Sequence, residues 1–242
     1  MFYKNITSKM KKYNLVDFNY FSFQVVAPEI KVANIDYNTS VIINEINKYA
    51  DNTNLIIFPE LILTGASCGD LFFTKELIEK IEPALNKIIE ETYKKNTTII
   101  LGTPFLISNK LYNVAMLISN GKIIGIVPSR YKTRWFEEYF YQQKQQHINN
   151  ILFNDYYVPF DVNLTFTCKD FNNCKLMLLI GEPNIDDFAR CSNVQIVINL
   201  NSNPFNIEKT STELIKQLSV LNRQGIIYVN SNASESTTDY VY

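Results

Sequence analysis

A carboxylate and several small polar residues directly follow an apolar stretch in the first third of the chain. Glu60 comes after the run LIIF and Pro59, and the next segment, LILTGASCGDLFF, contains Cys68 and Asp70. A carboxylate at the carboxyl end of a strand points toward the pocket at a sheet edge, where it can act as a general base. The alternative is an exposed acid that opens a loop, although the segment behind it is too apolar for an idle surface loop.

The other reactive residue types are few. The single histidine, His147, lies in the polar run QQKQQHINN, where we expect a solvated loop. A Ser-His-Asp triad or a histidine-based metal site would therefore have to use this one histidine. The four cysteines, Cys68, Cys168, Cys174 and Cys191, form no CxxC pair and are too sparse in 242 residues for a disulfide scaffold. We expect reduced thiols, no metal and no other cofactor.

Composition and charge limit the classes of partner. Hydrophobic residues make up 46% of the chain and charged residues 19%, which is typical of a folded globular domain. A net charge of -1 provides no field that would attract nucleic acid or an anionic membrane. No apolar stretch of signal-peptide or membrane-spanning length is present. These features predict a cytoplasmic protein with neither nucleic-acid nor membrane partners.

Segments with strand and helix periodicity alternate along the chain. The turns NGK and DFNN join neighbouring strands as hairpins, so a mixed sheet, or two sheets with helices outside, fits better than a purely parallel sheet. Helices are expected in YNTSVIINEINKYADN, in KELIEKIEPALNKIIEETYKKN with a break near Pro83, and near 210–223. Strands are expected in FSFQVVAPE, NLIIFPE, TTIILGTPF, LYNVAMLIS, KIIGIVPS, LTFTC, KLMLLIG, VQIVINL and GIIYVNS.

Several motifs resemble one family along nearly the whole chain from Phe21 onward. FPELILTG, CGDLFF, KLYNVAMLISNGKIIGIVP and INLNSNPF are similar to the carbon-nitrogen hydrolase (nitrilase) superfamily, specifically the glutaminase domain of glutamine-dependent NAD+ synthetase. The resemblance implies an α/β fold, a nitrilase-type αββα sandwich with mixed sheets and outer helices. We expect an N-terminal extension over 1–20 and a nitrilase-like domain over 21–242, truncated at its C-terminus and without a synthetase domain.

The resemblance also assigns catalytic positions. The family's chemistry uses a glutamate as general base, a lysine that stabilises the oxyanion and a cysteine as nucleophile. Glu60 of FPEL matches the glutamate, but Ser129 in GIVPSRYK stands at the lysine position. In IGEP, Gly181 stands where a motif like ICED carries the cysteine. Because glycine has no side chain, no acyl-enzyme can form at position 181.

Further positions form a candidate ligand site. The resemblance implies that Tyr131 and Glu182 contribute to substrate binding, and that Asn201 and Asn203 replace serines of a family stretch NLSASPF. Lys132 would reach this site only after a loop rearrangement. The cysteines other than Cys68 are expected to be structural, and Cys68 matches a family cysteine that is not the nucleophile.

The first hypothesis is a pseudoenzyme used for binding or assembly, either as a homo-oligomer or with a full-length NAD+ synthetase, with a small amide as ligand. Its contact patch would be the aromatic run RYKTRWFEEYFYQQ, which contains Trp135, Phe136, Tyr139, Phe140 and Tyr141. The alternative is that half of these side chains fill the local core.

The second hypothesis is an active amide hydrolase that supplies ammonia for NAD+ synthesis with relocated catalytic groups, using Glu60 to activate water or a displaced thiol. A third is a decaying gene product without a selected role.

Overall fold

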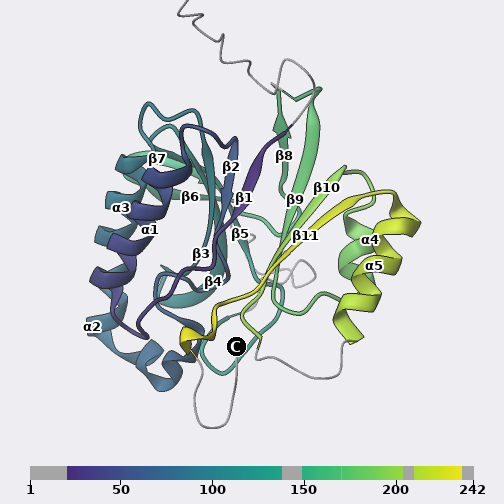
Figure 1. Ribbon diagram of the computed structural model, residues 1–242. Coiled ribbons are helices and arrows are strands. Elements are labelled where there is room, and N and C mark those ends of the chain that lie inside the picture. The colour runs from purple at the N-terminus through teal and green to yellow at the C-terminus, as the bar shows by residue number, and fades with distance from the viewer. Residues whose placement is uncertain (1–20, 138–148, 170, 204–209, 236–242) are drawn as a thin grey trace, which may run out of the picture.

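The computed structural model describes residues 21–137, 149–169, 171–203 and 210–235. Two β-sheets pack face to face, and helices cover both outer faces (Figure 1). This four-layer arrangement is the αββα sandwich with mixed sheets that the sequence predicts. No helix of the described ranges is long and apolar enough to cross a lipid bilayer.

The first sheet has the strand order β1-β2-β3-β4-β5. Its first three strands are parallel, whereas β4 runs antiparallel to both of its neighbours. The helices α1, α2 and α3 lie on its outer face (Figure 1). The bounds of these elements are β1 Phe23–Val25, α1 Ile35–Tyr49, β2 Leu55–Ile57, α2 Lys75–Ile78, α3 Ile81–Glu91, β3 Thr98–Ile107, β4 Lys110–Ser119 and β5 Lys122–Pro128.

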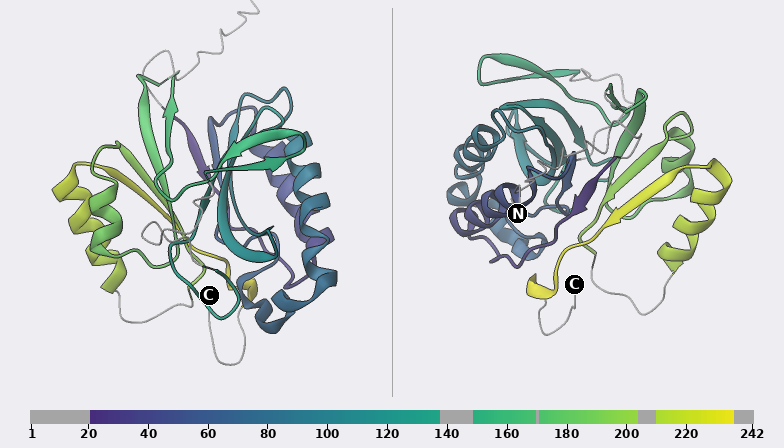
Figure 2. Two further views of the ribbon diagram at one scale, coloured as in Figure 1. Left: turned by 180° about the vertical axis from the view of Figure 1, so that it is seen from behind. Right: turned by 45° about the horizontal axis from the view of Figure 1, so that its top comes forward.

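The second sheet has the order β11-β10-β9-β8, with β8 antiparallel to β9 and the other pairs parallel. The helices α4 and α5 cover its outer face, as the two views of Figure 2 show. A two-stranded sheet, β6-β7, completes the fold. The bounds are β6 Asn150–Phe153, β7 Tyr156–Pro159, β8 Thr165–Cys168, β9 Cys174–Ile180, α4 Ile185–Arg190, β10 Ile196–Leu200, α5 Thr210–Asn222 and β11 Gly225–Val229.

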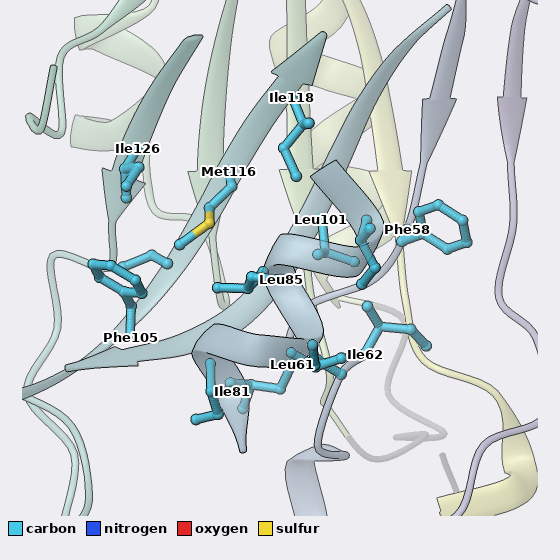
Figure 3. Close-up of a cluster of buried hydrophobic side chains, with 14 of the residues drawn as sticks. Phe58, Leu61, Ile62, Ile81, Leu85, Leu101, Phe105, Met116, Ile118 and Ile126 are labelled. Carbon is cyan, nitrogen blue, oxygen red and sulfur yellow. The ribbon is translucent and has the colours of Figure 1, made fainter. Parts of the chain in front are cut away.

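Three apolar cores separate the four layers because side chains alternate between the two faces of each strand. In β9, Leu178 packs between the sheets, whereas Met177 and Leu179 pack against the helices on the outer side. The largest cluster lies between the first sheet and its helices, where Leu85 of α3 meets Leu101 and Met116 (Figure 3). Burial of these apolar surfaces provides the main driving force for the fold.

The structure confirms the predicted strands and helices and corrects three details. The break in the second predicted helix lies at Glu79 and Lys80, whereas Pro83 sits in the first turn of α3, where its missing N–H is harmless. The strand β6 begins inside a segment that sequence analysis treats as polar loop. Phe136 of the aromatic run is buried and packs on Phe72 with ring centroids 4.8 Å apart, so it fills the core.

The rest of that aromatic run divides between the core and undescribed positions. Trp135 is partly buried and packs against the same core as Phe136. Tyr139, Phe140 and Tyr141 lie outside the described residues, as does His147. The structure therefore places Phe136 in the core and Trp135 partly in it, and the contact role of the rest of the run stays a prediction.

Gly102 in β3 fixes the approach of this strand to the segment that carries Glu60. A Cβ atom at position 102 would lie 2.5 Å from the Cα of Glu60 and 2.5 Å from the carbonyl oxygen of Pro59. Atoms cannot approach so closely, so only glycine allows the two backbones to pack in this way. The sheet thus holds the Glu60 backbone directly against its neighbouring strand.

We predict that Gly102→Ala lowers the free energy of unfolding by about 1–3 kcal/mol, because the added methyl group must push the Glu60 backbone away. Urea unfolding of the full chain measures the change. Gly225→Ala in β11 is the matched control, since its Cβ would meet neighbours only at 3.8 Å, and it should change stability by about 1 kcal/mol or less. Equal losses in the two variants would contradict the close-approach argument.

Candidate active site

Glu60 lies just beyond the end of β2, at the sheet edge where the parallel strands end. Its side chain is buried, with 7% of its surface exposed. The following residue, Leu61, has a φ of +52°, and its carbonyl accepts hydrogen bonds from the N–H groups of Thr64 and Gly65 at 3.1 and 2.7 Å. This tight turn directs the chain away from the sheet and leaves the Glu60 carboxylate facing inward.

Two hydrogen bonds hold the Glu60 carboxylate. The Nδ2 of Asn113, in β4, donates to Glu60 Oε1 over 2.5 Å, and the Oγ of Ser202 donates to Glu60 Oε2 over 3.0 Å. Burial raises the pKa of Glu60 to about 7, although the two hydrogen bonds lower it in part and the nearby Glu235 carboxylate raises it slightly. Near neutral pH this group is therefore able both to accept and to release a proton.

Ser129, at the position that the resemblance assigns to the lysine, lies beside the same network. It follows β5, is buried, and its N–H donates to the carbonyl of Asn113 over 2.7 Å. Its Oγ accepts a hydrogen bond from the N–H of Tyr131 over 3.3 Å. Asn113 therefore contacts both Glu60 and Ser129. Lys132 instead pairs with Glu137 at 3.5 Å and is largely exposed, as expected for a residue that does not replace a catalytic lysine.

Gly181 follows β9 in the second sheet and adopts a φ of +81°, a conformation that favours glycine. Its N–H donates to the carbonyl of Leu200 over 2.8 Å, and its carbonyl accepts from Asn199 Nδ2 over 3.0 Å. These bonds tie Gly181 to Asn199 and Leu200 at the end of β10. Ser202, two residues further along the chain, bonds to Glu60. A Cβ at position 181 would meet no atom within 4 Å, so the space for a side chain there is open.

Glu182 forms a polar cluster with the two predicted asparagines. Its Oε2 accepts from Asn203 Nδ2 over 2.6 Å and from Asn201 Nδ2 over 3.2 Å. Asn201 is fully buried, and its Oδ1 accepts the N–H groups of Ser202 and Asn203, which shapes the turn after β10. Its Nδ2 also donates to the hydroxyl of Tyr228. Asn201 therefore aims Ser202 toward Glu60 while it holds Glu182.

Tyr131 lies in a separate network at the start of α4. Its hydroxyl donates to Asp187 over 2.8 Å and accepts from Asn184 over 2.7 Å. Asp187 is buried and also pairs with Arg130 and Arg190 at 2.6 and 2.9 Å. Although burial raises the pKa of Asp187, hydrogen bonds from Asn184 and the two guanidinium groups hold it below its ordinary value. The Tyr131 hydroxyl thus bonds to Asp187 and Asn184 and not to Glu60. The ligand role of Tyr131 stays a prediction.

Glu235 fastens the end of the described chain to the turn behind Glu60. Its buried Oε2 accepts the N–H groups of Ala66 and Ser67 at 2.5 and 3.1 Å. Burial raises the pKa of Glu235, and the two backbone donors lower it in part. The segment after β11 therefore closes over the loop that begins at Glu60.

Comparison with known proteins places this geometry in a family. A family model described as carbon-nitrogen hydrolase matches residues 25–181, which is more than half of the chain. The chain belongs to the carbon-nitrogen hydrolase family. The match includes Glu60 and Ser129 and ends at Gly181.

The relatives support the predicted resemblance to NAD+ synthetase. A glutamine-dependent NAD(+) synthetase of Aquifex aeolicus is 26% identical over 204 residues, which cover 82% of this chain and 33% of the relative. One of Mycobacterium tuberculosis is 25% identical over 206 residues, 79% of this chain and 30% of the relative. The chain thus spans about a third of the length of these relatives.

Solved structures show the same fold. The glutamine-dependent NAD(+) synthetase of Cytophaga hutchinsonii superposes with a TM-score of 0.74 at 22% identity, covering 92% of this chain and 37% of that protein. An amidase of Nesterenkonia from the nitrilase superfamily superposes with a TM-score of 0.70 at 12% identity, covering 91% of this chain and 79% of that protein. This member of the carbon-nitrogen hydrolase family therefore has the nitrilase fold.

Three residues of the site were not predicted from the sequence of this family member. Asn113 was hidden inside a strand motif, and Glu235 lies in the C-terminal stretch, far in sequence from the loop it binds. Ser202 had a visible signal, because NLNSNPF carries serine where the family stretch NLSASPF has alanine. Within the described residues, no group of three or more His, Cys, Asp or Glu side chains is arranged to hold a metal ion.

We predict that the stability of the wild type falls as pH rises from about 4.5 to about 7. Glu60 has an ordinary pKa of 4.5 and a folded-state pKa of about 7, so the folded state binds its proton more tightly and loses this advantage as the proton leaves. The size is on the order of 3 kcal/mol from Glu60, since each pKa unit corresponds to about 1.4 kcal/mol.

Urea unfolding at about pH 5 and about pH 8 measures this loss. Glu60→Gln keeps the side-chain shape but cannot titrate, so the difference between the two pH values should shrink by on the order of 3 kcal/mol. Glu235→Gln measures the separate contribution of Glu235 to the pH difference, because the pKa of Glu235 is also raised by burial. An unchanged pH difference in Glu60→Gln would show that Glu60 titrates alike in the folded and unfolded states.

Proposed function

We propose that this carbon-nitrogen hydrolase homologue does not perform cysteine-based amide hydrolysis and instead binds a small primary amide at the edge that carries Glu60. The observation that carries the proposal is the glycine at position 181, whose φ of +81° and open surroundings leave space but no nucleophile. Covalent amide cleavage of the family type needs an attacking sulfur at this place.

The state of Glu60 supports the same proposal. Both of its oxygen atoms accept hydrogen bonds from within the protein, from Asn113 and Ser202. Ser129 supplies a neutral hydroxyl at the position where the family has a cationic lysine, so it cannot stabilise a developing oxyanion by charge. The general base is present, but the two groups with which it would cooperate are not.

Ligand binding is supported by the polar groups that surround the open space. The carboxylate of Glu182 and the amides of Asn201 and Asn203 form a cluster of donors and acceptors next to Gly181. A primary amide offers two N–H donors and one carbonyl acceptor, which suits such a mixed surface. Glu60, with a pKa of about 7, can accept from or donate to the same ligand.

Assembly and location form the less specific part of the proposal. The helix α5 exposes Val220 and Leu221, with 77% and 75% of their surface accessible, so these two apolar side chains would be available to a partner. A second copy of this chain or a full-length NAD+ synthetase would be the partner. A cytoplasmic location agrees with cysteines that are present as thiols.

We predict binding without turnover. Glutamine at about 100 times its Kd should stabilise the wild type by about 2.7 kcal/mol, whereas no ammonia should be released above the uncatalysed rate. A thermal-shift titration measures the first quantity, and a coupled ammonia assay measures the second. Intact-mass spectrometry after acid quenching should find no acyl adduct on any cysteine.

Two variants define the controls for this prediction. Asn203→Ala should abolish the thermal shift because it removes a direct partner of Glu182, whereas Asn47→Ala on the distant α1 should leave it intact. Ammonia release at an ordinary enzymatic rate, on the order of 1 per second or more, that disappears in Glu60→Gln would overturn the non-catalytic proposal. Absence of any thermal shift with primary amides would overturn the binding proposal alone.

A second candidate function is favoured by the contact between Ser202 and Glu60. A nucleophile and its base normally lie 2.6–3.2 Å apart, with a third group orienting the base. Ser202 Oγ lies 3.0 Å from Glu60 Oε2, and Asn113 orients Glu60 from the other side. The arrangement therefore resembles an activated serine in a small acyl hydrolase.

In this candidate, Ser202 and Glu60 would together cleave an ester or an amide. Ser202 Oγ would attack the carbonyl carbon while its proton passes to Glu60, and the leaving alcohol or amine would take that proton as its bond to the carbonyl breaks. Water, deprotonated by Glu60, would then attack the acyl carbon, the bond to Ser202 Oγ would break as Oγ takes the proton back from Glu60, and the acyl group would leave as the acid.

For this second candidate we expect a fluorophosphonate probe to label Ser202 and p-nitrophenyl acetate to give a burst of nitrophenol. Ser202→Ala should abolish both signals, whereas Ser129→Ala, which changes the neighbouring serine that does not bond Glu60, should keep them. Peptide mapping locates the label. If the wild type takes up no probe under conditions that label a known serine hydrolase, the second candidate is excluded and the first proposal is strengthened.

A further inference from the structure

Two cysteines face each other at the end of the hairpin formed by β8 and β9. Cys168 ends β8, Cys174 begins β9, and the antiparallel register places them directly opposite one another. The turn between them is closed by hydrogen bonds from Cys174 N–H to the Phe171 carbonyl over 2.8 Å and from Phe171 N–H to the Cys168 carbonyl over 3.3 Å. The pair is thus held in one geometry by the backbone.

Both thiols lie on the face that points toward the other sheet. Phe166 and Leu176 form the next pair but one along the ladder, and both pack in the core between the sheets. Because side chains alternate along a strand, Cys168 and Cys174 lie on this same face. Burial raises the pKa of the Cys174 thiol, and the neighbouring Cys168 raises it further, so Cys174 ionises less readily than an exposed thiol and is suited to be the second thiol to react, not the first.

The spacing of such a pair suits a disulfide. Residues directly opposite in an antiparallel ladder have Cα atoms about 4.5–5.5 Å apart, and disulfides join cysteines whose Cα atoms are about 4.4–6.8 Å apart. Cys168 and Cys174 are also half-buried, whereas Cys68 and Cys191 are buried. The two opposed thiols are therefore both suitably spaced and within reach of solvent.

A cavity next to the pair gives small reactants access. It has a volume of about 300 Å³, and its lining includes Phe21, Phe166, Cys168, Phe171 and Leu176. Its other wall is formed by the residues at the start of β2 and β3, whereas Glu60 follows the end of β2. The thiol pair therefore lies at the end of the sandwich opposite to the candidate active site.

We propose that Cys168 and Cys174 are an oxidation site that forms a reversible intramolecular disulfide with small hydroperoxides. The Cys168 thiol, which lines the cavity, loses its proton and attacks an oxygen of hydrogen peroxide; the O–O bond breaks, the sulfur becomes a sulfenic acid, and the leaving hydroxide takes up the proton to form one water. The Cys174 thiol then loses its proton and attacks this sulfur, the S–S bond forms, and the hydroxide that leaves takes up that proton as a second water. The two sulfur atoms lose two electrons in total, and the peroxide is reduced.

The bond would tie the edge strand β8 covalently to β9 at the cavity. This inference concerns a different part of the molecule from the proposed amide site, so each can fail without the other. A small dithiol such as dithiothreitol reverses the reaction by thiol-disulfide exchange.

Hydrogen peroxide treatment of the full wild-type chain, followed by alkylation in denaturant and tryptic digestion, tests the proposal. Lys169 and Lys175 follow the two cysteines, so trypsin separates Cys168 from Cys174 and leaves them joined only by a disulfide. We expect the linked peptide pair to exceed any linkage to Cys68 or Cys191 by more than about tenfold, because the two thiols are held in place. Dithiothreitol should remove it.

The controls separate an intramolecular pair from chance oxidation. Cys174→Ser should eliminate the linked peptide and leave Cys168 open to the sulfenic-acid probe dimedone, whereas Cys191→Ser should leave the linkage unchanged. A tenfold dilution should not reduce the yield, since the bond forms within one chain. Full alkylation of Cys168 and Cys174 after peroxide treatment of the wild type, or a linkage that forms only between two chains, would overturn the proposal.

Discussion

The burial of one carboxylate organises the edge of the sandwich. Glu60 is enclosed because β3 passes close to its backbone at Gly102 and because Asn113 and Ser202 hold its two oxygen atoms. Asn113 belongs to the first sheet and Ser202 follows a strand of the second, so the carboxylate joins the two sheets at this edge. Burial makes this acid costly to ionise, so its pKa rises to about 7 even though the hydrogen bonds from Asn113 and Ser202 favour the ionised form.

The same edge determines which chemistry Glu60 could take part in. A base contributes to amide cleavage only when a nucleophile lies within reach of it and a positive or hydrogen-bonding group receives the developing charge. At position 181 the backbone turns with a φ of +81° and carries no side chain, although a Cβ there would meet no neighbour. The proposed amide site would therefore bind its ligand without cleaving it.

Local patterns in the sequence predicted the elements, whereas contacts between distant segments set the site. The apolar runs of β9 and β10 and the helical period of α1 depend on neighbouring residues, so they were visible without a structure. The positions of Ser129 and Gly181 came from a family resemblance, whereas Glu60 was also marked by its place after an apolar strand. Proline alone did not locate the break before α3, since Pro83 is tolerated in a first helical turn.

The network around Glu60 could not be derived from any single motif, because its members are far apart in the chain. Ser202 lies 142 residues from Glu60 and Glu235 lies 169 residues from Ala66, and each pair meets only when the two sheets pack. Asn201 links two parts of this network, because its side-chain amide shapes the turn that directs Ser202 toward Glu60 and also bonds to Glu182. The hydrogen bond between Ser202 and Glu60 is the structural basis for the proposed serine chemistry, whereas Gly181 is the basis for the proposed absence of cysteine chemistry.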